Sequence, residues 1–92
     1  MRLDLFLKAS RIVLRRSVAR QLCDAGAIKI NGIVAKASKE LKVADEIEIK
    51  RGPRRTVYRV VAIPTSKQVS RTDASSLVDM VGDVKEPETL LP

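Results

Sequence analysis

Residues 27–35 read AIKINGIVA, a pattern that predicts a β-hairpin. Ile28 and Ile30 alternate with Ala27 and Lys29 at a period of two, which is typical of a strand. Asn31-Gly32 follows at once, and this pair favours a type I′ turn because both central residues of that turn need positive φ. Residues 33–35 are then expected to form the returning strand.

Upstream of the hairpin, apolar residues recur at a helical period. Leu3, Phe6, Leu7 and Ser10 stand at i, i+3, i+4 and i+7, which predicts a short helix over residues 2–9. This spacing places the four side chains on one face of the helix, where they can pack against another element.

A second helix is predicted to begin at Ser17 and to end before Gly26. Ser17 is suited to the N-cap because its hydroxyl can accept a hydrogen bond from a free backbone N–H. Gly26 is suited to the left-handed position that follows a helix. Between them, Ala19, Leu22 and Cys23 continue the apolar spacing. The first 26 residues are thus expected to form two short helices packed on each other.

Downstream of the hairpin, two more strands are expected before the composition changes. Residues 47–50 alternate cleanly between apolar and charged side chains, and residues 56–63 form the last strand. These elements predict one α+β domain over residues 1–64. Residues 65–92 are rich in Ser, Thr, Asp and Pro, so we expect a largely disordered C-terminal tail with at most one short helix, near residues 75–82.

The chain is strongly basic, and its charge is unevenly distributed. Among 92 residues there are 18 Lys and Arg against 11 Asp and Glu, which gives a net charge of +7. Residues 1–64 contain 15 of the basic and 6 of the acidic residues, whereas residues 65–92 contain 3 and 5. A compact basic domain of this kind suggests a polyanion as partner. The alternative is a basic surface that is merely solvated, but solubility needs a much smaller imbalance.

Six basic side chains are concentrated in the predicted helix pair and form a candidate site for a phosphate backbone. Five of the six are Arg, whose planar guanidinium group can donate two parallel hydrogen bonds to a phosphate. Asp4 is the only acidic residue among them, and one carboxylate cannot neutralise six cations, although a local ion pair with Arg2 or Arg11 is an open alternative. The six are Arg2, Lys8, Arg11, Arg15, Arg16 and Arg20.

Two further basic groups have open interpretations. Lys36 and Lys39, in the loop after the hairpin, either extend the basic face or are simply solvated. A second group of arginines is compatible with another RNA contact or with protection of a sheet edge against aggregation. It consists of Arg51, Arg54, Arg55 and Arg59. With one Phe and one Tyr in the chain, binding is expected to depend on charge and helix geometry more than on base stacking.

The sequence argues against catalysis. There is no His, no Gly-rich phosphate loop and no spacing typical of metal ligands, so neither a cofactor nor a metal is expected. Cys23 lies on the apolar face of the predicted second helix and is expected to be a small core residue. No apolar run reaches 18 residues, and the N-terminus lacks the features of a secretory signal. We therefore expect a cytoplasmic protein that is not an enzyme.

The first half of the chain contains a recognisable set of residues: Arg2-Leu3-Asp4, Leu7, Ser10-Arg11, Arg16-Ser17, Ala19, Gly26, Ile30-Asn31-Gly32 and Val43–Asp45. This set resembles the S4 RNA-binding domain, a family named after a ribosomal protein of the small subunit. The resemblance is specific over residues 1–50 and looser up to residue 63. It implies two to three short helices packed on a small, bent antiparallel sheet of four to five strands, the alpha-L RNA-binding motif. One departure is Ala44, where Gly is common.

Among free-standing domains of this type, the chain is similar to the RQC P-site tRNA-stabilising factors. The heat-shock protein fifteen family is a close relative, but its members typically carry aromatic residues, including Trp, early in the first helix, whereas this chain has Leu5 and Phe6 there and no Trp. The resemblance implies RNA contacts through Arg2, Arg11, Arg15, Arg16 and Lys36. It implies binding of peptidyl-tRNA and large-subunit rRNA on obstructed large ribosomal subunits, beside an RqcH/NEMF-type protein that directs alanine tailing; we also expect a monomer.

Two alternatives to this function stay open at the level of sequence. One is a heat-shock-type factor that recycles stalled free large subunits, and the other is a basic adaptor that binds an acidic protein. Phosphate contacts alone do not separate RNA from DNA, so only the family resemblance argues against DNA as the ligand.

Overall fold

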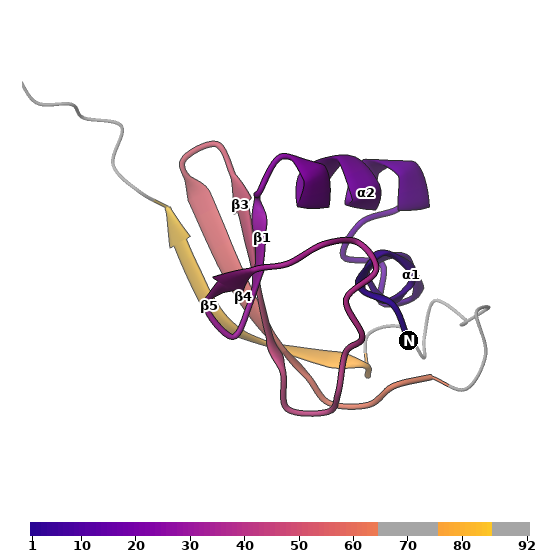
Figure 1. Cartoon of the computed structure of the whole chain (residues 1–92). Helices are drawn as coiled ribbons and strands as arrows, with labels where there is room; N and C mark the ends of the chain where they lie inside the picture. Colours follow the sequence, from indigo (N-terminus) through magenta and orange to yellow (C-terminus); the bar gives the residue numbers. More distant parts are fainter. Residues whose placement is uncertain (65–75, 86–92) are drawn as a thin grey trace, which may run out of the picture.

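Two short helices lie against a five-stranded antiparallel sheet in the computed structural model, which describes residues 1–64 and 76–85 (Figure 1). The helices are α1, Leu3–Ala9, and α2, Arg16–Asp24. The strand order is β2-β1-β3-β4-β5, and the α+β fold predicted from the sequence is confirmed. The strands are β1 (Ile28–Ile30), β2 (Ile33–Val34), β3 (Glu46–Arg51), β4 (Arg54–Val60) and β5 (Val78–Lys85).

The helices and the sheet share one apolar core. Leu3, Phe6 and Leu7 of α1 are completely buried, which confirms the stripe predicted for the first helix. Burying a side chain of this size contributes roughly 1.5–3 kcal/mol to stability. The helix α2 adds Ala19 and Cys23 to the same cluster. The strands and loops complete the core with Val13, Ile28, Ile30, Ala35, Leu41, Ile47, Ile49, Val60 and Leu77.

The start of α2 differs from the sequence prediction, whereas its end agrees. Arg15 holds the N-cap position with an extended backbone and no side-chain cap hydrogen bond, and Ser17 is already the second helical residue. The Ser17 cap is therefore a wrong prediction: Arg16 is already helical, and its side chain forms an ion pair with a residue of α1. Such a tertiary contact outweighs local capping preference. Gly26 follows the helix with φ of 74° in the left-handed region, as predicted.

The β1–β2 turn has the predicted geometry and anchors the start of β3. Asn31 and Gly32 both have positive φ, 52° and 85°. The Asn31 amide nitrogen donates a hydrogen bond to the Asp45 carboxylate at 3.1 Å, and its oxygen accepts one from the Glu46 backbone N–H at 3.0 Å. Just before Asp45, Ala44 has φ of 80°. That left-handed conformation costs a residue with a Cβ about 1–2 kcal/mol.

Residues 78–85 form strand β5, so the short helix expected near residues 75–82 is a wrong prediction. β5 pairs with β4 along its whole length, with one bulge. Without β5, strand β4 would present a row of unpaired N–H and C=O groups at the sheet edge, and pairing satisfies them. The sheet therefore extends beyond residue 64, where the sequence placed the end of the domain. The other parts of the expected tail, residues 65–75 and 86–92, lie outside the described residues.

Candidate nucleic-acid interface

Asp4, in the first turn of α1, is a carboxylate with no solvent exposure. A buried carboxylate is costly unless hydrogen bonds and opposite charges compensate for its lost hydration. One oxygen, Oδ1, accepts a hydrogen bond from the Leu5 backbone N–H at 2.9 Å. The remaining capacity of the carboxylate is taken up by arginine side chains, so Asp4 organises the basic surface around it.

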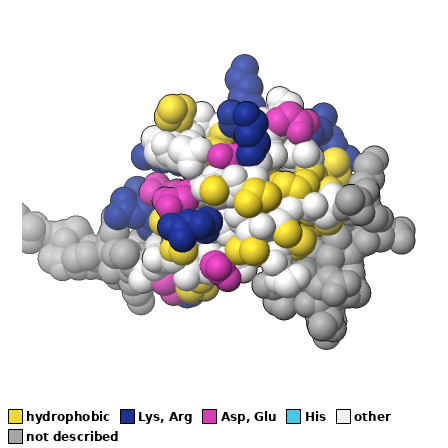
Figure 2. Space-filling model, turned by 90° about the horizontal axis from the view of Figure 1, so that it is seen from below, with side chains coloured by type: hydrophobic (Ala, Val, Ile, Leu, Met, Phe, Trp, Pro, Cys, Tyr) yellow, Lys and Arg dark blue, Asp and Glu magenta, His cyan; other side chains and the backbone are white. Residues whose placement is uncertain are grey.

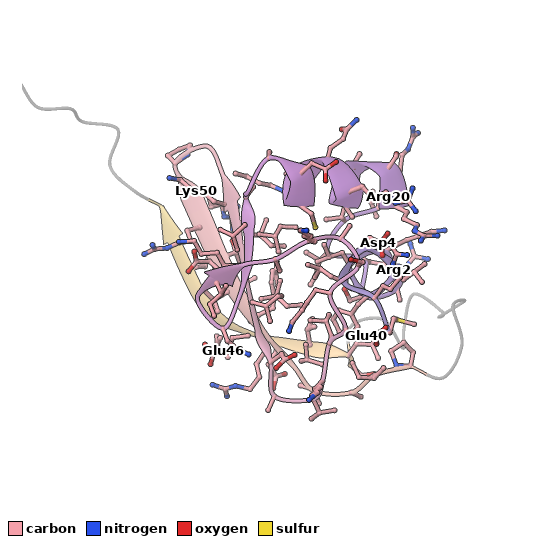
Figure 3. The ribbon with its side chains drawn as sticks, in the orientation of Figure 1. Arg2, Asp4, Arg20, Glu40, Glu46 and Lys50 are labelled. Atoms are coloured by element: carbon pink, nitrogen blue, oxygen red, sulfur yellow. The ribbon has the colours of Figure 1, made fainter. Side chains whose placement is uncertain are left out.

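Three arginines from two segments converge on Asp4. Arg16 and Arg20 stand one turn apart on α2, and each donates a hydrogen bond from Nε to Asp4 Oδ2, at 3.0 and 3.1 Å. Arg2 precedes α1, and its Nε lies 3.3 Å from Asp4 Oδ1 as an ion pair without hydrogen-bond geometry. Arg2, Asp4 and Arg20 lie together at the helix pair in Figure 3. We call Arg2, Arg16 and Arg20 the Asp4-bound arginines.

The Asp4-bound arginines keep most of their hydrogen-bonding capacity. Each approaches the carboxylate through Nε, and within residues 1–64 and 76–85 no hydrogen bond from their terminal guanidinium nitrogens is found. Their side chains are 41%, 36% and 52% exposed for Arg2, Arg16 and Arg20. Three positive charges on one negative charge leave a local surplus. Oriented guanidinium groups with free terminal nitrogens suit phosphate oxygens.

The pKa of Asp4 reflects this competition between burial and positive charge. Burial acts to raise the pKa, but hydrogen bonds from Arg16 and Arg20, the charge of Arg16 and the Leu5 N–H together lower it below the ordinary value of 3.8. Asp4 therefore stays ionised at neutral pH. An ionised Asp4 is what holds the three guanidinium groups in a fixed arrangement.

The other three cations predicted for the helix pair do not contact Asp4. Lys8, Arg11 and Arg15 are exposed, and in the part of the chain that the structure describes none of them forms an ion pair. Of the two local pairs left open by the sequence, Arg2 with Asp4 is present and Arg11 with Asp4 is not. Arg11 instead ends α1 in the left-handed region, with φ of 60°.

The loop that carries Lys36 and Lys39 lies against the start of α1. The Leu3 backbone N–H donates to the Lys39 carbonyl at 2.8 Å, and the Asp4 N–H donates to the Ala37 carbonyl at 3.2 Å. These carbonyls satisfy the first donors of α1, so that helix terminus is not open to an anion. The loop instead presents two exposed lysine side chains beside the helix pair.

The second arginine group is partly neutralised. Arg54 forms a two-point ion pair with Asp83 on β5, and Arg59 forms one with Glu46 on β3. These pairs link neighbouring strands. Acidic and basic side chains also lie side by side around a band of apolar side chains on the face of the molecule shown in Figure 2. On this face, basic side chains therefore have acidic neighbours.

Cys23 is a core residue, as predicted. It is buried, and burial, Asp4 and Asp24 together raise the pKa of its thiol to about 11, so it is not a reactive thiolate. Among residues 1–64 and 76–85 there is no group of three or more potential metal ligands. Within the same residues no helix has the length and apolar character needed to span a membrane.

Sequence reasoning missed the organising role of Asp4. It treated this residue as the single anion among six cations, with at most a local ion pair to Arg2 or Arg11. The available signal was its position, because Asp4 adjoins buried Leu3 and stands one turn before buried Leu7. A lone acid beside an apolar helix face and near several arginines is a candidate for a buried ion-pair centre.

Comparison with known proteins places these features in a family. The S4 domain matches residues 1–47. An RQC P-site tRNA stabilizing factor of Streptococcus pneumoniae is 39% identical over 98% of this chain and 100% of its own length. The factor of that name from Bacillus subtilis is 45% identical over 94% of each chain.

Two solved structures have the same fold. The solution structure of a hypothetical protein, HP1423, has a TM-score of 0.78 and 36% identity, over 89% of this chain and 98% of that one. The trimeric structure of Vibrio cholerae heat shock protein 15 has a TM-score of 0.78 and 27% identity, over 88% of this chain and 81% of that one.

Proposed function

Because this chain belongs to the S4-domain family of RQC P-site tRNA stabilizing factors, we propose that it binds peptidyl-tRNA and large-subunit rRNA on obstructed large ribosomal subunits. It acts by binding and not by catalysis. In this proposal it holds the tRNA in the P site while an RqcH/NEMF-type protein directs alanine tailing in the cytoplasm, and it works as a monomer.

The observation that carries this proposal is the convergence of three guanidinium groups on one buried carboxylate. A free arginine side chain loses about 2 kcal/mol of rotamer entropy when it is fixed on a ligand. Asp4 holds the Nε atoms of Arg16 and Arg20 before any RNA arrives, so part of that loss occurs on folding. Preorganisation of this kind raises affinity because binding then orders fewer side chains.

We propose that the remaining cations extend this surface. Lys8, Arg11 and Arg15 are exposed around the helix pair, and Lys36 and Lys39 are exposed beside the start of α1. If about six of these groups contact phosphates, the logarithm of affinity falls with the logarithm of salt concentration with a slope of roughly −4 to −5. A slope near zero would remove the electrostatic basis of the proposal.

The direct test is co-sedimentation of the tagged protein with ribosomal particles, followed by sequencing of the bound RNA. We expect the wild-type protein with large subunits that carry peptidyl-tRNA, and Arg16→Ala mostly at the top of the gradient. Arg59→Ala is the matched control, since it removes the same charge from a side chain paired with Glu46 on the sheet. Wild-type protein that never co-sediments with large subunits would refute the proposal.

A heat-shock-type role is the second candidate, supported by the structural likeness to heat shock protein 15. The two functions differ in what co-purifies with the large subunit. Peptidyl-tRNA in the P site together with the tailing partner supports the quality-control role. Free large subunits with tRNA in another position and without that partner support the heat-shock-type role.

A further inference from the structure

The β3–β4 hairpin places like charges directly opposite each other. In the strand register, Arg51 faces Arg54 and Lys50 faces Arg55. Like charges in directly opposed positions destabilise a sheet. Asp83 compensates Arg54, accepting hydrogen bonds from its Nε at 2.9 Å and its Nη2 at 2.6 Å. Arg51 is exposed and has no ion pair within residues 1–64 and 76–85, so the hairpin keeps an uncompensated cation where it is unfavourable.

Arg51 stands at the rim of a pocket of about 170 Å³. The pocket lies on the sheet face that carries buried Ile49, and Ile12, from the segment between α1 and α2, also lines it. This volume is below the roughly 300–1,000 Å³ of sites for drug-sized ligands, so the pocket suits one ring-sized group. Its lining consists of Ile12, Ile49, Arg51, Arg54, Thr56 and Tyr58, and we call it the hairpin pocket.

The hairpin pocket combines an aromatic ring, apolar side chains and positive charge. Tyr58 is half-buried and offers an aromatic surface, while Ile12 and Ile49 supply apolar contacts. Asp83 accepts hydrogen bonds from Arg54 and from the Thr56 hydroxyl, the latter at 3.2 Å. These bonds hold the side of the pocket next to Tyr58 in place. Arg51 is the charge left for a ligand. A run of acidic side chains would pair with Arg51 but would supply no ring to pack against Tyr58.

We propose that the hairpin pocket binds one unstacked base of single-stranded RNA, with the adjoining phosphate on Arg51. The base contacts Tyr58, since aromatic side chains accept any base and such stacking is a main source of affinity for single strands. This second contact rests on the proposed function, because it assumes an RNA ligand. Its lining includes none of the Asp4-bound arginines, and the end of β3 marked by Lys50 lies away from Arg2 and Asp4 in Figure 3.

Tyr58 provides a direct readout, because the chain contains one Tyr and no Trp. Its fluorescence therefore reports on the hairpin pocket alone. We would titrate the full chain with a short single-stranded adenylate oligonucleotide and expect saturable quenching. In Arg51→Ala the midpoint should shift to at least about fivefold higher oligonucleotide concentration, and the salt slope should become shallower by about 1. A thermal melt whose midpoint is unchanged or higher shows that Arg51→Ala still folds, since the substitution removes one of two directly opposed like charges.

Lys50→Ala is the matched control, because it removes the same charge from the neighbouring residue on the opposite face of β3. It should shift the quenching midpoint less than twofold, on the order expected for a distant screened charge. Equal shifts for Lys50→Ala and Arg51→Ala would overturn the proposal, since they would indicate a general charge effect.

Binding to folded tRNA, followed by anisotropy, separates this inference from the proposed function. Arg16→Ala should bind tRNA more weakly and keep the Tyr58 quenching by the oligonucleotide. If the wild-type protein binds tRNA but the oligonucleotide does not quench Tyr58, the proposal for the hairpin pocket is overturned and the proposed function is not. If the wild-type protein shows neither tRNA binding nor Tyr58 quenching, both the proposed function and the proposal for the hairpin pocket are overturned.

Discussion

The helix pair and the β3–β4 hairpin are both rich in arginine, but they balance their charge in different ways. In the helix pair, three arginines share one completely buried carboxylate, Asp4. On the sheet, Arg54 and Arg59 each have a carboxylate of their own near the surface. One-to-one surface pairs cancel charge and contribute little to stability. A shared buried carboxylate instead leaves surplus charge and fixes its direction, so the number of arginines in a region does not by itself identify a binding surface.

The largest effect should come from removing the shared carboxylate. Asp4→Ala takes away the hydrogen-bond acceptor of Arg16 and Arg20, and because those side chains are partly exposed we expect a loss of only about 2 kcal/mol in the free energy of unfolding. Glu46→Ala, which removes the exposed partner of Arg59, should cost less than about 1 kcal/mol. Urea denaturation of the two variants measures the difference. Equal losses in the free energy of unfolding would show that Asp4 contributes no more to stability than a carboxylate in a surface ion pair.

The second effect concerns RNA affinity. Arg16→Ala should weaken binding of tRNA about tenfold, a loss typical of one charge-assisted hydrogen bond, and should make the salt slope shallower by about 1. Arg59→Ala removes the same charge from the sheet and should change affinity less than threefold, on the order expected for an exposed paired charge. Filter binding at several salt concentrations measures both. A similar loss for the two variants would mean that net charge alone determines binding.

The third effect is a dependence of stability on acid. The folded pKa of Asp4 lies below its unfolded value near 3.8, so its contribution to stability is fully present above that value and is lost as the pH falls through the lower, folded pKa. Asp83 also has a lowered pKa, caused by Arg54, but it is exposed and should contribute little. Urea midpoints between about pH 2 and 5 should therefore vary less with pH in Asp4→Asn than in the wild type or in Asp83→Asn. An unchanged profile in Asp4→Asn would contradict this assignment.

The smallest effect lies outside both basic regions and separates stability from binding. Ala44 has φ of 80°, so Ala44→Gly should relieve strain and raise the free energy of unfolding by about 1 kcal/mol. The affinity for tRNA should not change. Ala62→Gly, at an exposed position without positive φ, should instead destabilise by a few tenths of a kcal/mol through the unfolded chain. If Ala44→Gly altered RNA affinity, stability and binding would not be independent in the variants above.

Local signals were enough to predict most of the fold. Both apolar helix faces, the Asn31-Gly32 turn and Gly26 after α2 depend on short-range preferences, and the structure confirms them. Strand β5 could not be found in this way. Its apolar residues are also compatible with a helical turn. They form a strand because β4 offers an edge for pairing, and that edge exists only once the sheet is assembled.

The candidate site was predictable in composition but not in arrangement. Sequence located the cations of the helix pair, since clustering is visible in one dimension. It did not show that Arg2, Arg16 and Arg20 share Asp4, because their contacts span up to 16 positions in the chain. The same limit applied to the start of α2, where a contact with Asp4 displaced the expected Ser17 cap.

A double-mutant cycle on tRNA affinity, with Asp4→Asn, Arg16→Ala and the double variant, tests most directly whether Asp4 acts through the arginines it holds. Asp4→Asn raises the net charge by one, so nonspecific attraction alone would tighten binding. We expect weaker binding instead, and we expect the double variant to lose clearly less than the sum of the two single losses. Tighter binding by Asp4→Asn, or losses that add to within about 0.5 kcal/mol, would contradict the account.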